Sequence, residues 1–89
     1  MLKISEPLTN HAVTLKLEGR LIGPWVAELK NACEQHLAAK QSINLDFADV
    51  TFADGTGLAL LLRLRARGVT LLNCSPFLEE ELRTVQNDN

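Results

Sequence analysis

The stretch Ile43–Leu58, INLDFADVTFADGTGL, decides the fold, because it carries a strand pattern, a loop and the start of a helix. Apolar and polar side chains alternate in its first part, which is the period of a strand with one buried face. Glycines then punctuate the sequence and predict a loop over residues 49–57. A helix is expected from about Thr56 to Arg67, where arginines and a following Gly68 favour its end.

Upstream of this stretch, the alternation of apolar and polar residues occurs twice more, in residues 2–5 and 12–18. Turn-forming residues 7–11 lie between them, so the pattern predicts a hairpin of two half-buried strands. The alternation then breaks, and Pro24 suits the first position of a helix. Apolar residues at spacings of three and four carry this amphipathic helix to about Lys40.

Downstream, Val69–Cys74 has the composition of a further strand. Ser75 then offers an N-cap and Pro76 a first helical residue for a helix whose last four residues, 86–89, look frayed. The order β-β-α-β-α-β-α predicts a single α/β domain over residues 1–89, with a mixed sheet of about four strands and three helices. The expected core includes one face of the strands, namely Val13, Leu15, Leu17, Ile43, Leu45, Phe47 and Leu71.

Composition narrows the function classes. The 89 residues are 46% hydrophobic and 22% charged, which is typical of a soluble globular domain. A net charge of −2 and the scarcity of aromatic residues argue against a nucleic-acid surface. The longest apolar run, Leu58–Leu62, is far shorter than the roughly 20 residues that span a bilayer. With no apolar stretch at the N-terminus that would serve as a secretory signal, we expect a cytoplasmic protein without direct membrane insertion.

Enzymatic chemistry would need a nucleophile, a base and an orienting group close together. The residue types that could supply them are Asp46, Asp49, Thr51, Asp54, Thr56 and Ser75. A magnesium site between Asp49 and Asp54 is conceivable, but aspartates in loops routinely cap helices and bond to the backbone. The two histidines and two cysteines show no metal-ligand spacing. They are His11, Cys33, His36 and Cys74. We therefore expect no enzyme, no metal and no cofactor.

The loop Asp54–Gly57 is a candidate phosphate-binding site, because glycines at the start of a helix leave backbone N–H groups available to an anion. A Walker-type loop has four residues between its glycines and a lysine after them, and this loop has neither. A hydroxyl at such a turn is instead a candidate for phosphorylation, which would add about −1.5 to −2 charges. Thr56 is that hydroxyl.

At this loop the sequence resembles the STAS domain, the module named for sulphate transporters and anti-sigma-factor antagonists. The matching stretches are Leu15–Leu21, Ile43–Leu58 and Val69–Pro76, within a resemblance that spans about residues 12–85. The family's phosphoacceptor directly follows the loop aspartate, and here that position is Gly55, with Thr56 one residue further on. The resemblance also leads us to expect that the family's last strand and helix are absent after the helix that starts near Ser75.

The resemblance implies a non-enzymatic protein that works by docking. One branch of the family binds an anti-sigma factor that is itself a GHKL-type serine kinase, and phosphorylation of the loop hydroxyl abolishes that binding. The alternative branch is a small cytoplasmic subunit of a lipid-transport ABC system, bound to its ATPase, and the run Gly57–Leu62 is similar to it. A phosphocarrier, a third class, would need a histidine at a helix start, which neither His11 nor His36 provides.

The expected partner-binding residues are those of the loop and of one side of the helix after it: Asp54, Gly55, Thr56, Gly57, Leu60, Arg63 and Leu64. At about 100° per residue from Leu58, Leu60 and Leu64 fall near 200° and 240°, outside the seam that one buried stripe needs. They either pack against a neighbouring helix or form an exposed apolar ridge beside arginines. Such a ridge would bind another protein or a second copy of this chain in a homodimer.

Overall fold

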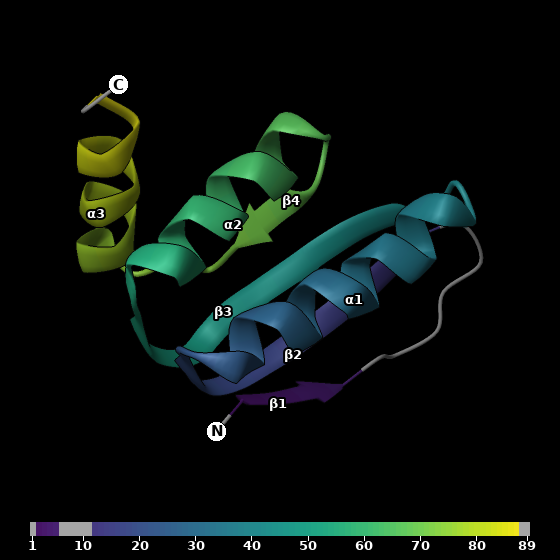
Figure 1. Ribbon diagram of the computed structural model, residues 1–89, viewed down its shortest axis with the longest axis horizontal. Coiled ribbons are helices and arrows are strands. Elements are labelled where there is room, and N and C mark those ends of the chain that lie inside the picture. Colours follow the sequence, from purple (N-terminus) through teal and green to yellow (C-terminus); the bar gives the residue numbers. More distant parts are fainter. Residues whose placement is uncertain (1, 6–11, 88–89) are drawn as a thin grey trace.

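The computed structural model describes residues 2–5 and 12–87 of the chain. Its elements, in chain order, are β1 (Leu2–Ser5), β2 (Ala12–Leu21), α1 (Pro24–Ala38), β3 (Ser42–Ala53), α2 (Gly55–Ala66), β4 (Thr70–Leu72) and α3 (Pro76–Asn87). This is the predicted α/β fold, with three helices and a sheet. Figure 1 shows the path of the chain through these elements.

The sheet has the strand order β1-β2-β3-β4, which follows the order of the sequence. β1 runs antiparallel to β2, with Ile4 opposite Leu17. β2, β3 and β4 run parallel to one another, which places Leu45 between Leu15 and Leu71. The turn predicted between the first two strands lies outside the described residues.

One face of the sheet carries the core. α1 and α2 cover this face, and α3 stands at the end of the molecule beside α2 (Figure 1). Six of the seven predicted core residues are buried, whereas Leu71 is only partly so, because it lies in the three-residue edge strand β4. The opposite face of the sheet carries polar side chains such as Thr14, Lys16 and Asn44, none of which is buried.

The structure corrects the predicted loop over residues 49–57. β3 continues to Ala53 and pairs with β2, with Asp49 opposite Glu18 and Ala53 opposite Leu21. The register shifts between Lys16 and Glu18 and again between Gly19 and Arg20. Such bulges interrupt the alternation of buried and exposed residues that identifies a strand in a sequence. β2 also runs three residues beyond its predicted end, because Gly19 interrupts the apolar alternation without ending the strand.

Candidate functional site

Asp54 is the residue that joins β3 to α2, and its carboxylate organises the site. Its Oδ1 atom accepts hydrogen bonds from the backbone N–H of Gly57 and from the hydroxyl of Thr56, both at 2.8 Å. Its Oδ2 atom accepts a bond from the N–H of Gly23, at 3.0 Å, in the connection between β2 and α1. One side chain therefore caps α2 and ties together two loops at the same end of the sheet.

The same three bonds set the charge state of Asp54. The backbone N–H groups of Gly23 and Gly57, followed by the Thr56 hydroxyl, hold the pKa of the Asp54 carboxyl below its ordinary value. Hydrogen bonds to the ionised form favour that form. Asp54 is therefore an anion whose oxygens are engaged inside the protein, as expected for a helix cap.

The two glycines of the loop differ in what surrounds them. A Cβ atom on Gly57 would lie 2.8 Å from the carbonyl oxygen of Leu21 and 3.0 Å from the Cγ of its side chain. Gly57 thus allows the start of α2 to approach the end of β2. A Cβ atom on Gly55 would meet nothing within 4 Å, so a larger residue fits at this exposed position.

Of the predicted site residues, the structure places Gly55, Thr56 and Arg63 on the surface and leaves Asp54 half-buried, while Gly57 is buried. Thr56 and Arg63 are seven residues apart, two turns of α2, and so share one side of the helix. The Thr56 hydroxyl is accessible even though it donates to Asp54. The surface formed by the loop 54–57 and Arg63 is called the loop–Arg63 surface below.

The prediction that Leu60 and Leu64 form an exposed apolar ridge is wrong. Their side chains are only 2% and 1% exposed and belong to the core. α2 packs against α1, α3 and β3, so more than a single stripe of the helix is covered. Of the two explanations considered for these leucines, packing inside the fold is the correct one, and they are unavailable to a partner.

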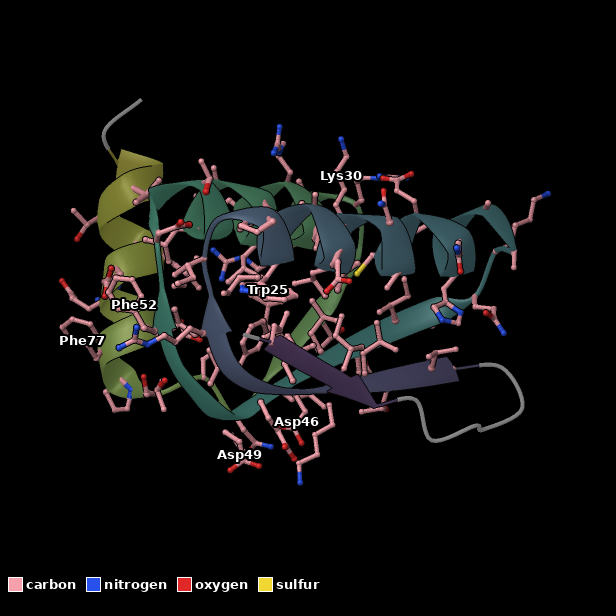
Figure 2. All side chains as sticks on the ribbon, turned by 60° about the horizontal axis from the view of Figure 1, so that its bottom comes forward. Trp25, Lys30, Asp46, Asp49, Phe52 and Phe77 are labelled. Carbon is pink, nitrogen blue, oxygen red and sulfur yellow. The ribbon has the colours of Figure 1, made fainter. Side chains whose placement is uncertain are left out.

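The remaining candidates for chemistry are engaged in structural bonds. Asp46 accepts hydrogen bonds from the Ala48 N–H and the Asn73 amide, both at 3.0 Å, and these bonds lower its pKa. The Asp49 carboxylate lies 3.4 Å from the Lys16 ammonium on the polar side of the sheet (Figure 2). Ser75 caps α3 through a bond from the Leu78 N–H at 3.0 Å, as predicted.

Within residues 2–5 and 12–87, no three His, Cys, Asp or Glu side chains gather in a way that could hold a metal ion. In the same part of the chain, every helix is too short or too polar to cross a membrane.

Sequence reasoning missed one surface feature. Phe52 and Phe77 are 50% and 72% exposed and lie near each other between the end of β3 and the start of α3 (Figure 2). Phe52 lies in a predicted loop and Phe77 at a predicted helix start. Neither belongs to a periodic pattern that would predict whether its side chain is buried or exposed. The two side chains come near each other only in the fold, where they line one hollow between the end of β3 and the start of α3.

Comparisons with known proteins agree with this architecture. Residues 4–88 match the family described as "Mlab, STAS domain". The fold and the capped loop define a STAS domain. The chain belongs to this MlaB STAS-domain family, as the resemblance in its sequence predicted. A comparison with curated proteins gives no significant match.

Solved structures share the fold at low sequence identity. The unphosphorylated anti-sigma factor antagonist SpoIIAA has a TM-score of 0.73 and 22% identity over 91% of this chain and 82% of its own. The phosphorylated form of SpoIIAA, a Bacillus cell fate determinant, gives 0.71 and 23% over 92% and 82%. A Shewanella loihica protein with a SpoIIAA-like fold gives 0.60 and 14% over 99% and 79%.

Proposed function

We propose that this chain is a non-enzymatic interaction module of the cytoplasm that docks a regulatory protein through the loop–Arg63 surface. The expected partner is an anti-sigma factor of the GHKL serine-kinase type. The observation that carries the proposal is the triple hydrogen bonding of Asp54, which fixes the loop while leaving Gly55 and Thr56 exposed. A surface that is ordered before binding loses little conformational entropy when a partner binds.

Phosphorylation of Thr56 is the regulation that we propose for this surface. The Thr56 hydroxyl donates a hydrogen bond to the Asp54 carboxylate at 2.8 Å, and a phosphate ester at that oxygen has no hydrogen to donate. The added charge of about −1.5 to −2 would repel the ionised Asp54 carboxylate, although the start of a helix favours an anion. Modification would therefore alter both the charge of the surface and the bond that holds the loop.

Gly55 occupies the position where the family carries its acceptor hydroxyl. Because a Cβ atom there would meet open space, a Gly55→Ser variant should fold normally and present a hydroxyl at that position. The variant separates two requirements of regulation, recognition by the kinase and the presence of an acceptor. Phosphorylation of Gly55→Ser but not of the natural chain would indicate docking without a functional phosphoswitch.

The test uses the cognate GHKL-type kinase, which is to be sought among the neighbouring genes, purified and titrated by calorimetry. Arg63→Glu should weaken binding at least tenfold, because it reverses the charge of an exposed residue on the surface. Lys30→Glu is the matched control, since it makes the same charge change at an exposed residue of α1 and should leave the affinity unchanged. Equal affinity of the two variants would contradict docking at this surface.

A second candidate partner is the ATPase of a lipid-transport ABC system. The run Gly57–Leu62 supports this candidate, because it resembles that branch of the family. The same two variants distinguish the candidates when the kinase and the ATPase are titrated in parallel. Only the true partner should bind with an affinity that responds to Arg63→Glu and not to Lys30→Glu.

A further inference from the structure

An exposed aromatic strip lies at the end of the sheet where β3 meets α3. Its central residues are Phe52 and Phe77, which lie near each other in Figure 2 and line one shared hollow. Large apolar side chains exposed side by side are unusual on a monomer and mark interaction sites. The proposed docking of a regulatory partner does not use either residue.

Three hollows follow one another along this strip. The first is lined by Arg20, Ile22, Thr51 and Phe52. The second shares Thr51 and Phe52 with the first and extends to Phe77 and Glu81. The third shares Phe77 and Glu81 with the second and continues along α3 to Val85. Along the strip Arg20 comes first and Phe52 next, followed by Phe77 and Glu81, which line the same two hollows. A cation therefore lies at one end, and a carboxylate lies toward the other.

The size of the two hollows that Phe77 lines favours side chains as their occupants, whereas the hollow lined by Arg20 and Phe52 is larger, at about 370 Å³. The two hollows that Phe77 lines measure about 20 Å³ and about 190 Å³. Small-molecule sites usually measure roughly 300–1,000 Å³. A ring inserted from another protein surface suits such shallow apolar hollows better than a cofactor does.

We propose that the occupant of this strip is a second copy of the chain. A two-fold axis that passes between Phe52 and Phe77 relates the two copies. In such a contact the same patch faces itself, so residue i of one copy meets residue j of the other and the reverse holds too. The order of the strip is complementary under this rotation. Phe52 of each copy meets Phe77 of the other, and Arg20 of each copy meets Glu81 of the other.

The charges at the two ends support a second copy as the occupant. Within the part of the chain that the structure describes, neither Arg20 nor Glu81 takes part in an ion pair, and Arg20 is exposed. Aromatic centres with charged rims are typical of protein interfaces. The lining residues are fewer than the roughly 20–30 per side of a standard interface, so we expect a weak dimer with a Kd on the order of 100 µM.

Sedimentation velocity over a concentration series tests the proposal. Arg20→Glu alone and Glu81→Arg alone should each weaken dimerisation at least tenfold, because each places like charges opposite one another at both ends. An equimolar mixture of the two variants should restore the dimer, because both ends of the mixed dimer then pair opposite charges. The controls are Lys30→Glu and Glu28→Arg, at two exposed residues of α1. They carry the same charge changes and should dimerise like the natural chain.

The aromatic centre has its own variant and control. Phe77→Ser should weaken the dimer, while Leu72→Ser, at another exposed apolar residue, should not. A chain that stays monomeric up to about 1 mM would overturn the proposal, since that is the weak end of specific association. A dimer whose affinity is unchanged by Arg20→Glu would contradict the two-fold arrangement. The same holds if both single variants lose the dimer and mixing them does not restore it.

Discussion

The carbonyl oxygen of Leu21 lies 2.8 Å from the point where a Cβ atom on Gly57 would stand. The same oxygen accepts a hydrogen bond from the Asp54 N–H at 3.1 Å, so it cannot retreat without breaking a bond at the centre of the site. The start of α2 approaches the backbone and the side chain of Leu21 at the end of β2 this closely because Gly57 has no side chain. This contact fixes where Asp54 can reach both Gly23 and Gly57.

Gly57→Ala should destabilise the protein by about 1–3 kcal/mol, because the added methyl group overpacks a contact that backbone atoms form. Gly55→Ala is the matched control. It meets open space at an exposed helical position and should be neutral or stabilising by about 0.5–1 kcal/mol. Urea unfolding of both variants measures the difference. Equal stabilities would contradict the close approach of β2 and α2.

Acid should loosen the site through Asp54. Its folded-state pKa is lowered, so its contribution to stability is complete above the unfolded value near 3.8 and is lost as the pH falls through the folded value. Asp54→Asn removes this titration while keeping an oxygen that can cap the helix. The stability of the natural chain should therefore fall more steeply below about pH 4 than that of the variant. Parallel slopes in denaturant titrations at several pH values would contradict this assignment.

Neither cysteine should behave as a reactive thiol in the folded protein. Burial raises the pKa of Cys33 to about 11, and burial together with the Glu79 carboxylate raises the pKa of Cys74 to about 11 as well. The thiolate is the form that reacts, so alkylation at pH 8 should be slow for both residues and fast after unfolding in urea. Intact-mass measurement over time counts the modified thiols. Rapid alkylation of the folded chain would show that a thiol is activated.

Leu60→Asp should unfold the protein, because it places a carboxylate at a side chain that is 2% exposed. Arg63→Asp, one turn along α2, should leave the thermal midpoint nearly unchanged, because Arg63 is exposed. Circular dichroism melts of the two variants test which side of α2 faces the core. A stable Leu60→Asp variant would contradict the burial of Leu60 in the core.

Much of this architecture could be predicted from the sequence. The period of two in the strands and the spacing of three and four in the helices gave the element order, and Asp54 and Ser75 cap their helices as expected. What failed depends on packing between distant segments. Two bulges hide the continuation of β3, and α3 contributes to burying a side of α2 that the helix pattern alone leaves open.

The candidate site divides in the same way. Local chemistry identified the loop 54–57, because capping aspartates and glycines act on their near neighbours. The bond from Gly23 to Asp54 spans 31 residues and has no signal in the sequence, and neither does the meeting of Phe52 with Phe77. Contacts of this kind follow only from the way the strands are ordered in the sheet.

The central claim is that a partner docks on the loop–Arg63 surface, and hydrogen–deuterium exchange of the complex with the purified GHKL-type kinase or ABC ATPase tests it most directly. We predict slower exchange at the amides of residues 55–63, and the same pattern, weakened, for Arg63→Glu. Protection confined to the polar face of the sheet, at Thr14, Lys16 and Asn44, with unchanged exchange at the start of α2, would contradict the claim.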